Sequence, residues 1–520
     1  MEALRPCCMV PARLPTASYE KPMLHLPFRS VPTSIFPPIR QCTARSRVVT
    51  AVSSTVSTEP VNPVGPEVQS HSQEEKFNWL LQWYPVMPVC DLDKRIPLAK
   101  KVIGLDVVVW WDRNENAWKV FDDMCPHRLA PLSEGRIDQW GRLQCVYHGW
   151  CFNGSGDCKF IPQAPPDGPP VHTFKKACVS VYPSTVQNDI VWFWPNTDPR
   201  YKDILMKNKP PYIPELDDPS YTRLMGNRDI PYGYAREIKL VFSVKADREG
   251  GRPLEMKIQK LDRSGFIGKQ EGGTSKFIPP CVFYVSSDLF IDKTNGSASS
   301  VETKKEVQRR MLLIFICIPV SPGNSRLIWT FPRNFGVWVD RVVPRWMFHV
   351  GQNLILDSDL YLLHVEERKI MDIGPSNWQK ACFVPTKSDA CVVGFRKWLN
   401  KYAGGQVDWG TKFSGALPPT PPKEQLMDRT TCYHLHVLVS CGELQQLQSG
   451  NQRSECARGC LTSHLSCFNW IVAATKQSLM SVAARTALVS MAVICFAASR
   501  WLSHFIYKIF HFHDYNHALR

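Results

Sequence analysis

The chain has 520 residues, 44% of them hydrophobic and 21% charged, a balance typical of globular proteins with two or three cores and not of disordered or fibrous chains. The formal net charge of +15 suits an acidic partner or an anionic membrane surface, and no segment resembles a nucleic-acid-binding module. The 19 cysteines, an odd number spread along the chain, argue against a disulfide framework and for free or metal-bound thiols in a reducing compartment.

The first fifty residues have the composition of an organellar transit peptide. They hold seven Lys and Arg against two Glu, with many Ser, Thr and Pro. A secretory signal needs an uninterrupted apolar core of roughly 7–15 residues, whereas prolines and charges interrupt the stretch from Met1 to Pro32. The same prolines leave no Arg-rich amphipathic helix, which favours a plastid over a mitochondrial destination. We expect a plastid transit peptide at residues 1–50, with a disordered basic tail as the alternative, and a linker at residues 51–76.

Residues 77–200 have the pattern of a small β domain. Short β-branched and aromatic runs, such as VIGLDVVVWWD (102–112), alternate with Gly, Asp and Asn turns. This region contains two short loops, Cys125-Pro-His127 and Cys145-Val-Tyr-His148, which are separated by seventeen residues.

These two loops offer two thiolates for one iron and two imidazoles for a second, which is the ligand set of a Rieske [2Fe–2S] cluster. A structural zinc site is the alternative, but zinc loops usually have C-x2–4-C or H-x3–5-H spacing, and Cys-x-His is tighter than either. We predict that the cluster is held by Cys125, His127, Cys145 and His148. Cys151 and Cys158 follow closely and could form a local disulfide or remain free, packed thiols.

Residues 201–430 mix strand-like runs with helical ones at 353–370 and 391–402, which predicts an α+β domain. Residues 431–470 are Cys- and Gln-rich without a usable period. Gln477–Ser499 is an apolar stretch of helix-forming residues interrupted by Arg485. Because a membrane span needs about 20 mostly apolar residues, we predict a membrane anchor and tail at residues 471–520. A buried or membrane-surface helix is the alternative.

Several longer segments carry a family resemblance. They are CPHRLAPLSEGR (125–136), QCVYHGWCF (144–152), MGNRDIPYGY (225–234), KADREGGRPLE (245–255) and LDSDLYLLHVEE (356–367). With the tail at 473–491, they resemble the plant Rieske oxygenases of the pheophorbide a oxygenase group. The resemblance implies an α+β fold: a Rieske-type small β domain at 77–200, then a helix-grip catalytic domain at 201–430, with a C-terminal membrane helix.

The same resemblance implies a function. Family members are ferredoxin-driven monooxygenases that use O2 and a mononuclear non-haem Fe(II) on a chlorophyll-related tetrapyrrole. It further implies a chloroplast membrane, with the inner envelope favoured over the thylakoid, a possible homotrimer and a possible link to the plastid import translocon.

The chain departs from the family pattern at the iron site. In the family, a helix after IPYGY carries Asp-x-x-His-x3–4-His, which supplies two iron ligands. Here Tyr234 is followed by AREIKLVFSV, and His172 is the only histidine between His148 and His349. Asp359 matches the family's third ligand, with Asp357 as an alternative; a solvated helix-face carboxylate is the other interpretation of Asp359. A histidine-rich group at the end of the chain is too remote in sequence to complete the site; it consists of His511, His513, Asp514 and His517.

A second departure is the missing C-terminal Cys-x-x-Cys of the family. Our hypothesis is that Gly442–Trp470 is translated out of frame, and that the loss after Tyr234 reflects a skipped exon. We therefore expect the cluster to assemble and oxygenation to fail in this chain. The alternatives to an oxygenase are a non-catalytic redox component of the import machinery and the product of a defective gene model.

Overall fold

The computed structural model of the protein describes residues 76–165, 167, 170–235, 255–270, 273–289, 309–412, 416–427, 454–464, 466 and 481–506. The chain divides into two compact units, Met1–Ser70 and His71–Arg520, and all described residues belong to the second. The predicted transit peptide and almost all of the linker lie outside the described residues. So do the segment 236–254, most of the Cys/Gln-rich segment and the histidines of the tail.

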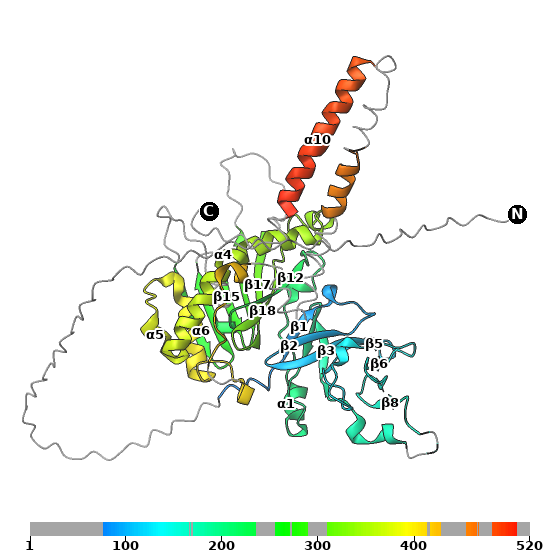
Figure 1. Ribbon diagram of the computed structural model, residues 1–520. Helices are drawn as coiled ribbons and strands as arrows, with labels where there is room; N and C mark the ends of the chain where they lie inside the picture. Colours follow the sequence, from blue (N-terminus) through cyan, green and yellow to red (C-terminus); the bar gives the residue numbers. More distant parts are fainter. Residues whose placement is uncertain are drawn as a thin grey trace, which may run out of the picture. The chain divides into compact units, whose positions relative to one another are not determined.

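The first part of the described chain consists of three small antiparallel sheets (Figure 1), in the strand orders β1-β11-β10, β2-β3-β4-β9 and β5-β6-β7-β8. The strands are β1 Tyr84–Pro88, β2 Leu98–Val102, β3 Leu105–Asp112, β4 Ala117–Asp122, β5 Arg136–Ile137, β6 Leu143–Gln144, β7 Cys151–Phe152, β8 Cys158–Phe160, β9 Val181–Tyr182, β10 Ser184–Gln187 and β11 Ile190–Phe193. β3 forms because four successive β-branched and aromatic residues, Val107 to Trp110, are buried on both of its faces.

Two-residue turns set the register of these strands. Asn188 and Asp189 both have positive φ and join β10 to β11, as a type I′ hairpin requires. The β2–β3 turn uses Ile103 and Gly104, also at positive φ, and a β-branched residue is costly there. The backbone N–H groups of these two residues donate to Pro319 O (2.6 Å) and Val320 O (2.9 Å), so contacts from outside the hairpin hold the turn.

The second part of the described chain is a seven-stranded antiparallel sheet in the order β12-β18-β17-β16-β15-β14-β13. Its strands are β12 Met225–Ile230, β13 Met256–Asp262, β14 Gly265–Gln270, β15 Gly273–Ile278, β16 Val282–Leu289, β17 Arg309–Ser321 and β18 Asn324–Thr330. The helices are α1 Lys202–Lys207, α3 Val339–Val342, α4 Arg345–Ile373, α5 Trp378–Ala381, α6 Ala390–Tyr402 and α7 Lys423–Met427. α6 packs on β13 and β14, and side chains of α4 reach β12 and β18.

The predicted α+β class is confirmed, and both predicted long helices exist, although α4 begins eight residues earlier than the sequence pattern indicated (345 against 353). The domain boundaries remain predictions. A single hydrophobic core includes residues of both parts, from Tyr84 and Val107 to Phe277 and Trp398. The two parts are therefore joined by shared packing as well as by the chain.

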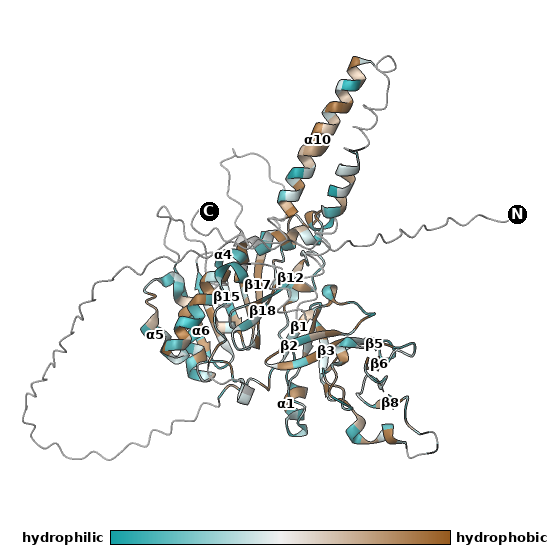
Figure 2. Ribbon diagram, in the orientation of Figure 1, coloured by the Kyte–Doolittle hydropathy of each residue, from teal (hydrophilic) through white to brown (hydrophobic). Residues whose placement is uncertain are grey.

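α10 spans Val482–Ile506 and is, in the part of the chain that the structure describes, the one helix long and apolar enough to cross a membrane. Figure 2 shows that most of its length is hydrophobic. Arg485 lies in the first turn of α10 and not in its middle, because the helix continues to Ile506. The charge therefore falls where a flanking residue of a membrane span is tolerated.

A buried ion pair links the two parts. The Arg326 side chain on β18 is fully buried and donates from Nε to Asp229 on β12 at 2.6 Å. The same guanidinium donates to the backbone oxygen of Val86, on β1, at 3.3 Å. Arg326 thus ties the large sheet to the small β part through one desolvated charge.

We expect Asp229→Ala to lower the free energy of unfolding by about 3–5 kcal/mol, because it removes the carboxylate that is paired with the fully buried guanidinium of Arg326. Chemical denaturation of the variant and the wild type measures the difference. Asp93→Ala is the matched control, because it removes the partner of the exposed Arg95 and should change stability little. Equal effects of the two substitutions would contradict this role of Asp229.

Candidate functional site

The first Cys/His loop follows β4 and is closed by its own backbone. The Cys125 N–H donates to Ala130 O at 2.8 Å, and the Leu129 N–H donates back to Cys125 O at 2.9 Å. Leu129 takes the left-handed conformation, with φ of 60°, so that the chain can turn back toward Ala130. The closure buries Cys125 almost completely and leaves His127 half-buried.

The second loop lies between β6 and β7 and is closed in the same way. The Cys145 N–H donates to Trp150 O at 2.8 Å, and the Gly149 N–H donates to Cys145 O at 3.1 Å. Gly149 has φ of +72°, and a Cβ there would lie 3.0 Å from Pro162 Cγ. A side chain at this position would be strained by the backbone conformation and would require Pro162 to shift, so glycine is favoured here.

The two loops bring the four predicted ligands together. Cys125 and Cys145 belong to one buried core, and their thiols are within hydrogen-bonding reach. Burial, together with the nearby Cys145, raises the pKa of the Cys125 thiol to about 12. The rings of His127 and His148 lie side by side, with centroids 4.6 Å apart.

The donor arrangement fits a two-iron cluster. The two thiols lie in one buried core and the two imidazole rings lie beside each other, and among the described residues the buried His148 Nδ1 has no hydrogen-bond partner. Within the described ranges, no group of three or more His, Cys, Asp or Glu gathers as a single ion would require. A Rieske centre needs no such group, since each iron takes only two protein ligands. The arrangement is compatible with the predicted cluster, and the choice between this cluster and the zinc alternative stays a prediction.

Aromatic side chains hold the imidazoles. The Trp150 indole is stacked on the His127 ring, with centroids 4.8 Å apart and planes 8° apart. Tyr147 lies against His148 at 4.0 Å. Both imidazoles line a surface hollow of about 560 Å³ whose rim carries Arg128 and Lys176. The site therefore opens toward solvent through a basic rim.

The structure settles the alternative for the two neighbouring cysteines. Cys151 and Cys158 are both buried and both free. The sequence could not choose between a disulfide and packed thiols, because the choice depends on how the side chains of β7 and β8 point.

The candidate iron carboxylates lie on α4, on different sides of the helix. Asp357 is fully buried and accepts an ion pair from Arg228 of β12 at 2.7 Å. Arg228 also donates to Asn353, one helical turn earlier, at 3.2 Å. Asp359 is half-buried, and a step of two residues turns it about 200° around the helix from Asp357. The role of Asp359 stays a prediction.

The interior between β12, β18 and α4 is rich in buried polar groups. Three buried donors have no hydrogen-bond partner among the described residues: Asn353 Nδ2, Trp329 Nε1 and Thr330 Oγ1. The His349 ring lies 5.4 Å from Trp329. The sequence analysis missed this group; the signal was the spacing of His349, Asn353 and Asp357, which recur every four residues on one face of a helix.

The residues present do not fit a mononuclear iron held by two histidines and a carboxylate. The described ranges contain no three-ligand group. Residues 236–254 lie outside those ranges, but their sequence contains no histidine. Moreover, the ion pair with Arg228 already neutralises the buried carboxylate of Asp357.

A further buried histidine, His364, lies two turns beyond Asp357 on α4. Its Nδ1 is 2.6 Å from Pro231 O, so this nitrogen carries the hydrogen and donates. Burial lowers the pKa of His364, and the nearby Arg368 lowers it too, while the bond to Pro231 opposes them. The neutral imidazole is the form that this environment favours.

Comparison with known proteins gives two family matches. The Rieske [2Fe-2S] domain matches residues 82–183, and pheophorbide a oxygenase matches residues 277–377. Protochlorophyllide-dependent translocon component 52, chloroplastic, of Arabidopsis thaliana is 53% identical, with 100% of both chains covered. Flavonoid 8-hydroxylase 2, chloroplastic, of Ocimum basilicum is 49% identical over 96% of this chain and 94% of its own. Pheophorbide a oxygenase, chloroplastic, of Arabidopsis thaliana is 34% identical over 85% of this chain and 84% of its own.

Because burial lowers the pKa of His364 in the folded state, while the unfolded chain protonates near pH 6.5, the contribution of His364 to stability should be complete above about pH 6.5 and should be lost as the pH falls from there toward the lowered pKa. His364→Asn can still donate to Pro231 O and does not titrate. Its free energy of unfolding should therefore decline less between about pH 7 and pH 5. Denaturation curves across this range test the prediction, with His172→Asn as the control. An unchanged pH slope in His364→Asn would contradict it.

Proposed function

Because the chain belongs to the pheophorbide a oxygenase family of Rieske proteins, we propose that its function is that of the family, oxygenase chemistry on a chlorophyll-related tetrapyrrole in the chloroplast with single electrons from ferredoxin, and that the chain with this sequence retains the electron-transfer part alone. Members of this family are oxygenases. Support for the substrate class comes from relatives named for protochlorophyllide and pheophorbide a. The observation that carries the electron-transfer part is the convergence of the four Cys and His side chains.

We propose that Cys125 and Cys145 bind one iron and that His127 and His148 bind the other. Once bound, such a cluster takes up and releases one electron at a time. The protein's contribution is to bury the thiols, to hold both imidazoles at the surface hollow and to fix the His127 ring against Trp150. Neutral histidines in place of two thiolates raise the reduction potential relative to an all-cysteine cluster.

The basic rim of the hollow suits an acidic donor such as ferredoxin. Arg128 and Lys176 lie beside the imidazoles, and the whole chain carries a net charge of +15. Opposite charges steer association and make its rate fall with ionic strength. We place the electron entry at this hollow on that ground.

Oxygenation of a substrate by this chain itself is a separate question from electron transfer by the cluster. Because the residues present do not fit the mononuclear iron, we derive no oxygenation step from them. The competing function is a redox component of the plastid import machinery. A relative named as a translocon component favours it, as does the absence of a histidine pair between His172 and His349 in the sequence. A defective gene model is the third possibility, and transcripts across the codons for Gly233–Lys245 and Cys441–Ile471 distinguish it from the others.

A second substrate class has a specific observation behind it. The relative from Ocimum basilicum is named a flavonoid hydroxylase and is 49% identical, close to the 53% of the translocon component. We keep the tetrapyrrole as the proposed class, and a flavonoid is the second candidate.

Cys125→Ser and His148→Ala should each prevent retention of the cluster, because each removes one of only two protein ligands of an iron. The half-buried Cys178 offers a control, and Cys178→Ser should keep the cluster. Metal analysis of the purified wild-type chain should find about two irons and two sulfides and no third iron, and the reduced protein should give a Rieske-type EPR spectrum. A third iron would show that the chain completes a mononuclear site.

Turnover tests the oxygenase part. The wild-type chain, reduced by ferredoxin under O2, should accept electrons but release no oxygenated product from protochlorophyllide, pheophorbide a or a flavone, because two iron ligands are missing. Products are measured by chromatography, and cluster reduction is followed by absorbance. An oxygenated tetrapyrrole would show that the chain is a complete oxygenase, whereas an oxygenated flavone would move the substrate class to the second candidate.

A further inference from the structure

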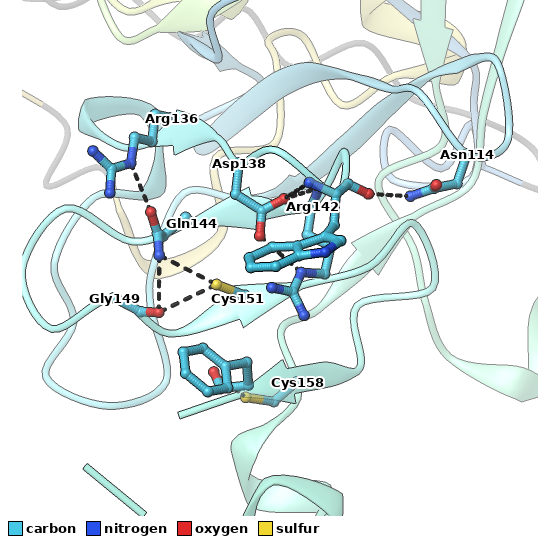
Figure 3. Close-up of polar contacts among 10 residues, drawn as sticks. Asn114, Arg136, Asp138, Arg142, Gln144, Gly149, Cys151 and Cys158 are labelled. Atoms are coloured by element: carbon cyan, nitrogen blue, oxygen red, sulfur yellow. Dashed lines mark hydrogen bonds and ion pairs between the residues drawn. The ribbon is translucent and has the colours of Figure 1, made fainter. Parts of the chain in front are cut away.

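Three side chains on neighbouring strands form a row that ends at the second ligand loop. Arg136 on β5 lies opposite Gln144 on β6, and Gln144 lies opposite Cys151 on β7. Arg136 Nε donates to Gln144 Oε1 at 2.6 Å, which leaves the amide nitrogen of Gln144 directed away from Arg136. Figure 3 shows the row, with the Gly149 carbonyl at its end.

Two side chains at the end of the row, those of Gln144 and Cys151, donate hydrogen bonds to one backbone oxygen, that of Gly149. Gln144 Nε2 donates to Gly149 O at 3.4 Å and also contacts Cys151 Sγ at 3.4 Å. The Cys151 thiol donates to the same Gly149 O at 3.2 Å. Cys151 is fully buried, so its thiol points into the protein and not toward solvent. Two further polar neighbours of Cys151 are Asp138 and Arg142, which are ion-paired with each other at 2.8 Å.

Gly149 is a sensitive place for such a contact, because it directly follows His148 in the chain. Its N–H closes the loop onto Cys145 O, and its φ of +72° directs the next peptide group back toward the sheet. With N–H and C=O both bonded, the Gly149 peptide groups cannot rotate without breaking a hydrogen bond. A rotation there would move His148 relative to Cys145, and these are two of the four proposed ligands.

We propose that Gln144 and Cys151 are positioning residues for the cluster: together they clamp the Gly149 carbonyl and so fix the angle at which the second loop presents His148. Arg136 acts through Gln144 by orienting its amide. This inference rests on the proposed ligand set, and it assigns a role to the free thiol of Cys151 that needs neither a disulfide nor a metal. Groups that orient metal ligands typically change metal affinity by about 10- to 100-fold when they are removed.

The variants separate positioning from packing. Gln144→Leu keeps the approximate size of the side chain. It removes the hydrogen bond to Gly149 O, the contact with Cys151 Sγ and the hydrogen bond from Arg136. Cys151→Ala removes the thiol donor, and Cys151→Ser restores a donor of similar size. Gln187→Leu is the matched control, because Gln187 donates to two backbone oxygens of another loop, Pro210 O at 2.7 Å and Pro211 O at 2.8 Å.

The full-length proteins are challenged with an iron chelator, and cluster loss is followed by absorbance. We expect Gln144→Leu to lose its cluster about tenfold faster than wild type or more. Cys151→Ala should also lose it faster, whereas Cys151→Ser and Gln187→Leu should behave as wild type. The EPR lines of the reduced cluster should shift in Gln144→Leu and Cys151→Ala alone, which a purely structural defect would not produce.

Wild-type rates and unshifted spectra in both Gln144→Leu and Cys151→Ala would overturn the clamp. If Gln144→Leu does not fold, the test is the comparison of Cys151→Ala with Cys151→Ser. Equal rates of cluster loss in these two variants would overturn the role of the Cys151 thiol. A wild-type chain that holds no cluster would overturn the proposed ligand set itself, and this result is distinguishable because it precedes any variant.

Discussion

The site depends on two backbone rings, each of which returns the chain to its starting point within about five residues. Cys125 N–H to Ala130 O closes the first, and Cys145 N–H to Trp150 O closes the second. Closure is possible because Leu129 and Gly149 take the left-handed conformation. It leaves the two cysteines facing the core and the two histidines facing the surface. The burial of the thiols, the stacking of His127 on Trp150 and the basic hollow all follow from this orientation.

The second half of the protein contrasts with this completed site. The interior between β12 and α4 has a buried carboxylate and a buried guanidinium. Its described residues leave several buried donors without a partner and do not supply a three-ligand metal site. Arg228 provides the positive charge that Asp357 needs in a desolvated position. The described residues thus bring four potential cluster ligands together in the first part of the chain and form a buried ion pair between Arg228 and Asp357 in the second.

The four proposed cluster ligands could be named from the sequence because their signal is local; the structure brings these side chains together, and their binding of a cluster stays a prediction. Cys-x-His and Cys-x-x-His put the ligands within a single loop each, and no long-range information is needed to recognise them. The Gln144–Cys151 row was not predictable, because it depends on the register of β5, β6 and β7, which short two-residue strands do not reveal. The same holds for Asp357 and Asp359, since the rotation of α4 against β12 decides which carboxylate is buried. Ile103 at positive φ was also hidden, because a β-branched residue is not a turn signal.

The distance between the two arginines of α10 can be compared with the thickness of a bilayer that the helix would cross. Arg485 and Arg500 are fifteen residues apart, which corresponds to about 22 Å along a helix. The hydrocarbon core of a typical bilayer is about 30 Å thick. A spanning α10 is thus mismatched by several ångströms, and the long side chains of both arginines would have to extend outward to the headgroups while the bilayer thins around them. Such a helix is better suited to a thin membrane than to a thick one.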